Sequence, residues 1–401
     1  MPNSFSKPFS KSQKTESKKN VLSAVVGYQE AVKVKESLAE TGSDFSDKKW
    51  ATANTVAKLH PKRLTLEVSE IIEETASTKT FRLVSTGGSL PPFQAGQYIN
   101  LFVEIDGVQT ARPYAISSSP SQRDYYDLTV KRVQDGFVTP FLLDHIKTGQ
   151  QFLSTGPMGT FYHNPIFHGK DLVFLAGGSG IAPAISMLKN VLDSELDYQF
   201  HFIYASSYID DVILIKELRL LDQQHDNFKL TEVISRPPED YSGLTGHLES
   251  GLIKSLVGDV SSKMFYVCGP TPFNEHCQAQ LGNLGVESRF VRIEANGPPK
   301  HPDQLNNWPD TVSMEDEVTI TIKGKGSFKA KAGEPLLNSL ERNGYSAENA
   351  CRSGECSLCR VKLVSGEVFN PPEAHLRVSD KQFGWIHSCV AFPTEDIEII
   401  L

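Results

Sequence analysis

Three of the six cysteines of this chain lie within the stretch "CRSGECSLC" at 351–359. Cys351, Cys356 and Cys359 are spaced C-x4-C-x2-C, and Cys389 follows farther along the chain. This spacing is typical of plant-type [2Fe–2S] clusters, in which two irons need four thiolates from one loop and one distant point. Structural zinc sites more commonly use two short-spaced pairs, and only Cys356 and Cys359 form such a pair here. The spacing therefore favours an iron–sulfur cluster over zinc.

A second candidate site lies in "ARPYAISSSP" at 111–120. Arg112 and Tyr114 alternate on an extended segment, so their side chains share one face. A planar heterocycle that carries a phosphate would suit this pair, ring on ring and guanidinium on phosphate. An ordinary strand with a surface arginine fits equally well. In "DGFVTPFLL", Gly136 and Thr139 precede an apolar helical run, which suits either a phosphate or a plain N-cap.

Two further motifs combine a strand, a turn and a helix. In "VFLAGGSGIAPAISML" at 173–188 the glycines permit close backbone approach, and the helix start favours a pyrophosphate, although the G-x-G-x-x-G pattern is incomplete. In "FYVCGPTPFNEHC" at 265–277, Cys268 ends a predicted parallel strand, where ligands bind in open α/β sheets. Cys277 falls within the following helix and is expected to be a buried structural residue.

The elements that carry these motifs predict a multi-domain protein. Short strands broken by turns over 62–165 predict an antiparallel β-barrel, and alternating strands and helices over 166–296 predict an α/β domain with a parallel sheet. Residues 297–314 are rich in Pro and Asn and are interpreted as a linker. Residues 315–401 begin with a hairpin and a short helix and end with a strand. Residues 1–61 form an N-terminal extension, partly disordered, with a possible helix at 21–40.

Bulk properties exclude several classes of function. The net charge of −8 argues against nucleic-acid binding, and no apolar run approaches the roughly 20 residues of a transmembrane helix. The N-terminus lacks the apolar segment of a secretory signal. The clustered cysteines do not suggest a disulfide scaffold, so we expect a reducing compartment and a cytoplasmic protein.

Residues 315–401 closely resemble plant-type ferredoxin domains of β-grasp fold. The resemblance implies that Cys389 is the fourth cluster ligand and that the cluster moves one electron at a time. Ser357 stands where many relatives carry glycine. The motifs over 62–296, in their order, resemble the ferredoxin–NADP reductase superfamily. With the ferredoxin domain appended, the chain is similar to the reductases of phthalate dioxygenase and of the hybrid cluster protein.

This resemblance implies roles for individual residues. The expected flavin-binding residues are Arg112, Tyr114, Ala115, Ile116, Ser117, Gly136, Val138 and Thr139. The expected nucleotide-binding residues are Gly177, Gly178, Gly180, Pro183, Ser235, Arg236, Gly269 and Pro270. Cys268 is expected to place the nicotinamide, and Glu294 to assist hydride transfer electrostatically. Ala115 departs from the family's Ser or Thr, and Asn296 replaces an aromatic residue.

The implied function is an NAD(P)H-dependent reductase with FAD, or alternatively FMN, and a [2Fe–2S] cluster. Ser235 and Arg236 could bind a 2′-phosphate, but no further basic residue follows until Lys254, which favours NADH over NADPH. The expected electron acceptor is a separate protein: an oxygenase, a cytochrome or a hybrid-cluster protein. The competing hypothesis is a flavin/iron–sulfur redox sensor that docks a partner through residues 1–61.

Overall fold

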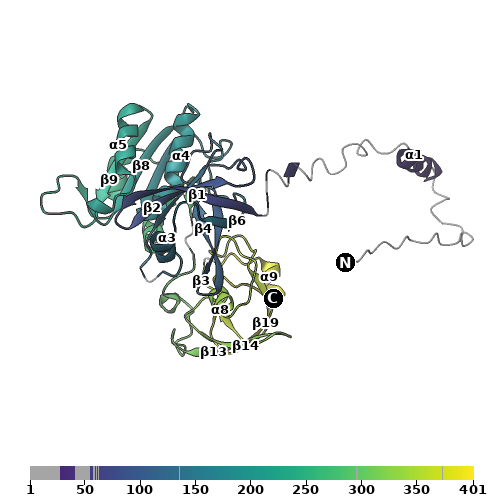
Figure 1. Ribbon diagram of the computed structural model, residues 1–401. Coiled ribbons are helices and arrows are strands. Elements are labelled where there is room, and N and C mark those ends of the chain that lie inside the picture. Colours follow the sequence, from purple (N-terminus) through teal and green to yellow (C-terminus); the bar gives the residue numbers. More distant parts are fainter. Residues whose placement is uncertain are drawn as a thin grey trace, which may run out of the picture. The chain divides into compact units, whose positions relative to one another are not determined.

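The computed structural model describes residues 28–40, 55–56, 59, 61, 63–134, 136–294, 297–372 and 374–401. The chain divides into two units, Met1–Lys58 and Leu59–Leu401. In the first unit, helix α1 (Tyr28–Glu40) lies within the stretch predicted to be helical (Figure 1). The predicted disorder of residues 1–20 and the departure at position 296 lie outside the described residues. Among the helices that are described, none is both long and apolar enough to span a membrane.

Residues 63–165, where the flavin site is expected, contain an antiparallel sheet of six strands and are called the flavin module below. In space the strands follow the order β4-β3-β6-β1-β2-β5. A bridge between Ile116 and Leu128 joins the end of β4 to β5, so the two edges of the sheet approach each other as in a barrel. The predicted antiparallel barrel is therefore confirmed. Its elements are β1 (Leu64–Thr75), β2 (Thr78–Ser85), β3 (Tyr98–Ile105), β4 (Val108–Ala115), β5 (Tyr126–Lys131), α3 (Thr139–His145) and β6 (Gln151–Ser154).

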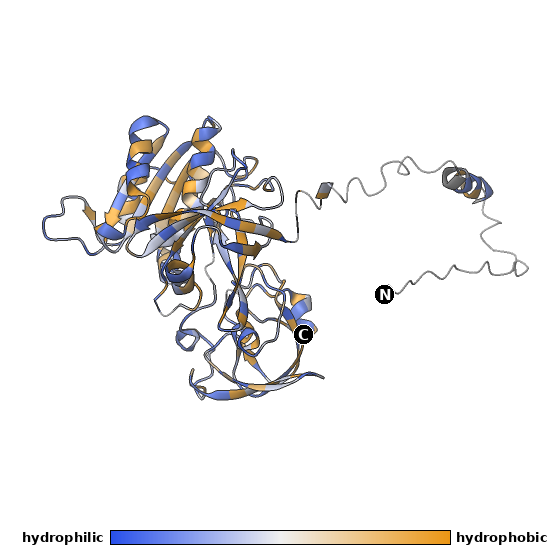
Figure 2. Ribbon diagram, viewed as in Figure 1, coloured by the Kyte–Doolittle hydropathy of each residue, from blue (hydrophilic) through white to orange (hydrophobic). Residues whose placement is uncertain are grey.

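Residues 166–294 form the nucleotide module, a parallel sheet of six strands in the order β10-β9-β8-β7-β11-β12. Helices pack on both faces, and the strands are predominantly hydrophobic (Figure 2). Strand order reverses between β7 and β11, which creates a crevice at their carboxyl ends. The elements are β7 (Asp171–Gly177), α4 (Ile181–Asp193), β8 (Gln199–Ser206), α5 (Ile215–Gln224), β9 (Phe228–Ile234), β10 (Leu244–Thr245), α6 (Ser250–Val257), β11 (Met264–Cys268), α7 (Thr271–Asn283) and β12 (Val291–Ile293).

Residues 315–401 form the ferredoxin module, a mixed sheet in the order β14-β13-β19-β15-β17. The first strand, β13, pairs in parallel with the last, β19, and antiparallel with β14 across the predicted hairpin. The short strands β15 to β18 were not predicted. The elements are β13 (Glu317–Ile322), β14 (Gly326–Lys331), α8 (Leu336–Arg342), β15 (Arg360–Ser365), β16 (Val368–Phe369), α9 (Val378–Gln382), β17 (Trp385–His387), β18 (Phe392–Pro393) and β19 (Ile397–Ile400).

The segment interpreted as a linker packs against the ferredoxin module. Trp308 is buried, and its ring lies 5.2 Å from that of Phe369 and 6.3 Å from that of Phe392, measured between centroids. The Trp308 indole N–H donates to the carbonyl of Val312 at 2.8 Å. Residues 305–314 therefore add a small hydrophobic cluster to this module and act as more than a tether.

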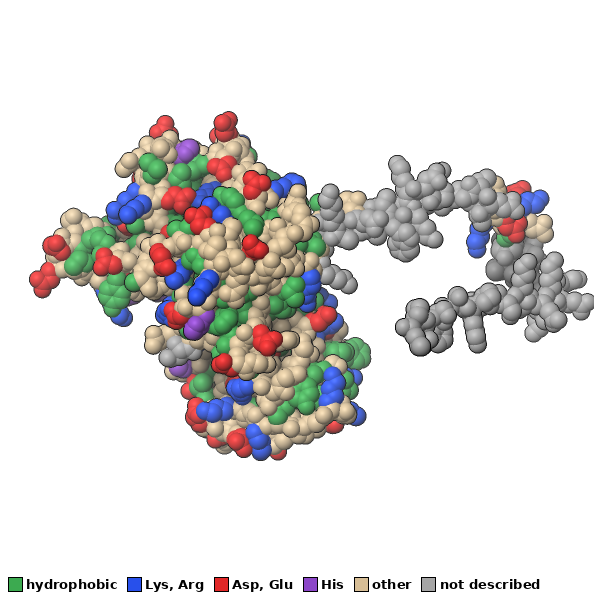
Figure 3. All heavy atoms as spheres, in the orientation of Figure 1, with side chains coloured by type: hydrophobic (Ala, Val, Ile, Leu, Met, Phe, Trp, Pro, Cys, Tyr) green, Lys and Arg blue, Asp and Glu red, His purple; other side chains and the backbone are tan. Residues whose placement is uncertain are grey.

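On the face drawn in Figure 3, lysine, arginine and acidic side chains are scattered among hydrophobic and other residues. Many are paired across neighbouring elements, as in the contacts of Arg82 with Glu70 and Asp127. An exposed pair such as Arg82 with Glu70 contributes little to stability, so the hydrophobic clusters of the modules carry the fold.

The packing of Trp308 allows a test of whether residues 297–314 belong to the ferredoxin module. Replacing Trp308 with alanine should lower the free energy of unfolding of the ferredoxin module by about 3 kcal/mol, because a large buried side chain is lost. Thermal unfolding followed by the visible absorbance of the cluster measures the change, and Trp308→Phe should restore most of it. Equal stability of the alanine variant and the parent would show that 297–314 is only a tether.

Candidate flavin, nucleotide and cluster sites

The four predicted ligand cysteines lie together as two close pairs. The sulfurs of Cys359 and Cys389 are 3.2 Å apart. The sulfur of Cys351 accepts backbone N–H groups from Ser353 and Cys356, each at 3.4 Å. The hydrogen bond from the Cys356 thiol, helped by these N–H groups and opposed by burial, lowers the pKa of Cys351 to about 4. Within each pair one cysteine is favoured as the thiolate and the other as the thiol, because the hydrogen bond that lowers the pKa of Cys351 raises that of Cys356, and the bond with Cys359 raises the pKa of Cys389.

Cys351 and Cys356 form one pair, and Cys359 and Cys389 form the other. Two thiolate pairs brought together from one loop and one distant strand end are what a two-iron cluster requires. The residues present therefore fit a [2Fe–2S] cluster, with Cys351, Cys356, Cys359 and Cys389 as the residues that could hold it.

The cluster loop is held in a tight coil. Arg352, Gly354 and Ser357 have φ values of 55°, 83° and 60°, all in the left-handed region that favours glycine. Glycine would adopt this conformation more easily at position 357, and the serine there costs backbone strain rather than a ligand. The ring of His387 bonds the carbonyl of Gly354 at 2.7 Å, and the Ser388 hydroxyl donates to the carbonyl of Cys359 at 2.8 Å. Sequence reasoning missed His387 and Ser388, which tie the distant Cys389 to the loop.

The flavin motif lies on β4, as predicted. The hydroxyl oxygen of Tyr114 is buried and has no hydrogen-bond partner among the described residues, so it fits a cofactor that supplies one. The guanidinium of Arg112 donates to the carbonyl of Ala111 at 2.8 Å and also bonds Thr110. Burial and the nearby Arg352 lower the pKa of Arg112 to about 10. A partly desolvated cation beside an unpartnered phenol suits an anionic, planar ligand.

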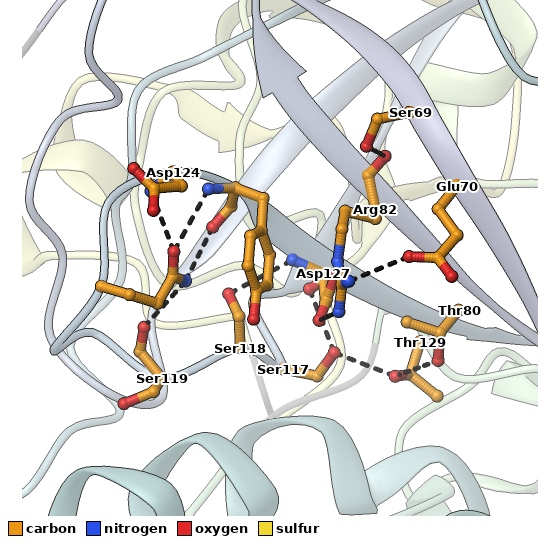
Figure 4. Close-up of polar contacts among 12 residues, drawn as sticks. Ser69, Glu70, Thr80, Arg82, Ser117, Ser118, Ser119, Asp124, Asp127 and Thr129 are labelled. Atoms are coloured by element: carbon orange, nitrogen blue, oxygen red, sulfur yellow. Dashed lines mark hydrogen bonds and ion pairs between the residues drawn. The ribbon is translucent and has the colours of Figure 1, made fainter. Parts of the chain in front are cut away.

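Ser117 belongs to a hydrogen-bonded network inside the barrel (Figure 4). Its hydroxyl donates to the carbonyl of Asp127 at 3.0 Å and lies 2.9 Å from that of Thr129, which in turn lies 2.9 Å from that of Thr80. The backbone N–H of Asp127 donates to the Ser118 hydroxyl at 3.2 Å. The Ser117 hydroxyl therefore bonds two neighbouring strand residues, and its role toward a flavin stays a prediction.

Other predicted flavin residues serve to shape the module. The side chains of Ile116 and Val138 are buried in the barrel core, and Ala115 ends β4. Thr139 begins α3, but its hydroxyl accepts the backbone N–H of Val133 at 2.9 Å instead of capping the helix. The N-cap is Val138, which makes no side-chain capping bond, so the plain N-cap interpretation of Thr139 is wrong. A Cβ at Gly136 would lie 3.1 Å from the Thr139 hydroxyl, so this turn is closely packed.

The glycine-rich turn after β7 meets the end of β11. A Cβ at Gly180 would lie 1.8 Å from the carbonyl oxygen of Cys268, and one at Gly177 would lie 2.9 Å from the Phe273 ring. Gly178 has φ 55°, which favours glycine. Gly180 therefore lets the turn after β7 lie against the end of β11, Gly177 lies against the Phe273 ring of α7, and Gly178 makes the turn. Cys268 itself is buried at this junction.

The remaining nucleotide residues lie around the same edge. Pro183 is buried in the first turn of α4, and Pro270 is the N-cap of α7, directly after Gly269. Ser235 and Arg236 follow β9, and the Arg236 guanidinium donates to the Tyr208 hydroxyl at 3.1 Å. Cys277 is fully buried in α7, as expected.

Lys131 is a basic residue that sequence reasoning missed. Its ammonium group would lie 3.7 Å from a Cβ placed on Gly178, and it pairs with Asp211. Asp211 also accepts the Ser77 hydroxyl at 2.6 Å, which joins the flavin and nucleotide modules beside the turn. A cation at this turn could bind a pyrophosphate. The sequence signal was weak, because Lys131 ends a barrel strand far from the glycines.

Glu294 lines a cavity of about 510 Å³ to which all three modules contribute. Its other lining residues include Thr160 and Phe161 from the flavin module, Arg292 from β12, and Glu355 and His375 from the ferredoxin module. Burial, and less strongly Glu355 and Cys351, raise the pKa of Glu294 to about 8. Phe161 also packs on Phe174 and Tyr266 inside the protein.

Three family models match the chain in the order of these modules. Residues 63–163 match the oxidoreductase FAD-binding domain, 174–279 the oxidoreductase NAD-binding domain, and 320–394 the 2Fe-2S iron-sulfur cluster binding domain. The glycine betaine monooxygenase reductase subunit of Pseudomonas aeruginosa is 30% identical over 343 residues, which cover 82% of this chain and 93% of that protein. The chain belongs to this family of flavin- and iron–sulfur-dependent reductases.

Other members show the same arrangement. The ferredoxin reductase component of 3-ketosteroid-9-alpha-monooxygenase from Rhodococcus rhodochrous is 29% identical, with 85% of this chain and 98% of that protein covered. The NADH oxidoreductase HCR of Escherichia coli is 27% identical, with 83% and 96% covered. The solved structure of phthalate dioxygenase reductase matches with a TM-score of 0.62 at 22% identity, over 84% of this chain and 97% of that chain. The expected fold is therefore confirmed.

The cluster site of this reductase is tested by replacing one ligand. Cys389→Ser should remove or destabilise the cluster, since one of four thiolates is lost. Reduction of ferricyanide by NADH, which can draw on the flavin directly, should persist, whereas cytochrome c reduction should fall by at least about tenfold, or roughly 1.4 kcal/mol on the barrier. Iron and labile sulfide analysis gives the direct readout, and Cys277→Ala should keep both. Full cytochrome c activity in the serine variant would contradict the assignment.

The glycine contact gives a matched test of the nucleotide site. Gly180→Ala would force the turn away from Cys268, so NAD⁺ should bind at least about tenfold more weakly, in line with an overpacking cost of 1–3 kcal/mol. A titration that follows quenching of protein fluorescence measures the dissociation constant. A Cβ at Gly282 of α7 would meet no atom within 4 Å, so Gly282→Ala should bind NAD⁺ normally. Equal affinity of the two variants would rule out this role for Gly180.

Proposed function

We propose that this reductase takes electrons from NADH and delivers them to the oxygenase subunit of a monooxygenase. The observation that carries the proposal is the match, over more than four fifths of the chain, to the reductase subunits of glycine betaine and 3-ketosteroid monooxygenases. When bound, FAD would accept two electrons as a hydride and release them one at a time, and the [2Fe–2S] cluster would carry single electrons to the acceptor. The redox-sensor hypothesis is not favoured, because these relatives are reductases along their whole length.

The residues of the site take the following roles in this proposal. Arg112 and Tyr114 bind the phosphate and the ring of FAD, and the turn at 177–180 with Lys131 binds the pyrophosphate of the dinucleotide. Cys268 and Gly269, at the junction of β7 and β11, place the nicotinamide. Glu294 borders the cavity shared by the three modules, where burial favours its protonated form near neutral pH. Cys351, Cys356, Cys359 and Cys389 hold the cluster.

NADH is proposed over NADPH because the adenosine end of the site carries little positive charge. Arg236 is exposed after β9 and stacks near Tyr208, 5.8 Å from its ring centroid. A 2′-phosphate usually meets a nearby Arg or Lys, and Arg236 already bonds the Tyr208 hydroxyl. A cytoplasmic location is proposed as well, supported by six cysteines that form no disulfide.

Anaerobic rapid mixing tests the acceptor. The full-length protein, NADH and either purified oxygenase subunit of the two related monooxygenases should give reduced oxygenase within seconds, at a rate well above that with cytochrome c. NADPH in place of NADH should be at least about tenfold slower, a difference of roughly 1.4 kcal/mol. Fast reduction of cytochrome c with no reduction of either oxygenase would count against an oxygenase acceptor.

A further inference from the structure

A buried carboxylate links the flavin strand to the cluster loop. Glu341, on α8 of the ferredoxin module, pairs with Arg352, whose guanidinium also donates to the second carboxylate oxygen at 3.1 Å. Thr110 of β4 donates its hydroxyl to Glu341 at 2.8 Å and accepts a bond from Arg112. Arg112 lies 3.9 Å from the same carboxylate. One glutamate therefore faces an arginine of the flavin motif and the arginine next to Cys351.

The network is removed from water. The residues Glu341, Arg352 and Thr110 are 8%, 5% and 5% exposed. A buried carboxylate with two cations and a hydroxyl has its hydrogen-bonding capacity largely satisfied, whereas loss of the carboxylate leaves two cations without a counter-charge. Such a network specifies one arrangement of its partners strongly, even where its net contribution to stability is small.

The flavin–ferredoxin boundary depends on this network more than on apolar packing. Across the flavin–nucleotide boundary, Ala95 and Phe161 join the hydrophobic cluster of the neighbouring module. By contrast, no hydrophobic cluster among the described residues contains side chains of both the flavin and the ferredoxin modules. Helix α8 nevertheless lies against β4. The hydrogen bond and ion pair of Glu341 thus give the flavin–ferredoxin boundary directional contacts, which apolar packing does not provide.

We propose that Glu341 is a positioning residue that locks α8 and the cluster loop onto the flavin strand β4, and so fixes the path between the two cofactors. This inference rests on the flavin and cluster sites proposed above, but it does not depend on which protein accepts the electrons. Glu341 contacts neither a predicted cluster ligand nor the unpartnered Tyr114 hydroxyl. It acts through Arg112, Thr110 and Arg352.

Hydrogen–deuterium exchange on the loaded full-length protein tests the lock without measuring activity. In Glu341→Gln, which keeps the shape and removes the charge, backbone amides of β4 and α8 should exchange at least about tenfold faster, because local opening becomes easier. Rapid mixing with NADH should show flavin reduction at the parental rate and slower passage of electrons to the cluster. Absorbance spectra must first show that flavin and cluster are both present.

Two further variants make the result decisive. Glu334→Gln is the matched control, because Glu334 pairs with Arg342 and Ser339 inside the ferredoxin module only, and it should leave exchange in β4 unchanged. Thr110→Val removes the hydroxyl that Glu341 and Arg112 share, and it should give a smaller increase of exchange in β4 and α8 than Glu341→Gln. This variant provides the test if Glu341→Gln does not fold. Parental exchange in β4 and α8 of the loaded Thr110→Val and Glu341→Gln variants, or equal changes in Glu334→Gln, would overturn the proposal.

Discussion

Thiolates, arginines and one buried glutamate meet where the flavin and ferredoxin modules join. Charges of this kind are stable away from water only when each finds its partner, so the contact tolerates few alternative arrangements. Arg352 follows the first cluster cysteine and Arg112 lies in the flavin motif, so the ion-pair network of Glu341 spans the interval between the two sites. The position of α8 on β4 is the constraint on which a relay from flavin to cluster depends.

In the nucleotide module the main constraint is close approach between the dinucleotide and the protein backbone. The parallel sheet reverses its strand order at β7 and β11, and glycines let the turn after β7 lie close against the end of β11 and the start of α7. Lys131 and Asp211 tie the barrel to this edge. Ala95 and Phe161 also extend the hydrophobic cluster of the nucleotide module, so these two modules share apolar packing. The ferredoxin module makes polar contacts with β4 through Glu341.

Local patterns in the sequence predicted much of this arrangement. The spacing of the cysteines, the alternating strands β1 to β3 and the strand–turn–helix around Gly178 depend on neighbours along the chain, so their types and places were predictable. Contacts between residues far apart in sequence could not be predicted from local patterns. They include the packing of Trp308 on Phe369, the bond of His387 to Gly354 and the contacts of Glu341. Ser117 and Thr139 show that a predicted ligand can also serve the fold: their hydroxyl groups bond neighbouring backbone and hydroxyl groups, which no local pattern indicated.

The most direct measurement is anaerobic rapid mixing of the loaded protein with NADH, with flavin absorbance and the electron paramagnetic resonance signal of the reduced cluster followed in one time course. Passage of electrons from NADH through flavin to the cluster predicts that flavin absorbance falls first and that the cluster signal rises after a lag. A cluster signal that rises before the flavin is bleached, or that never rises while the flavin is fully reduced, would contradict a relay through these two sites.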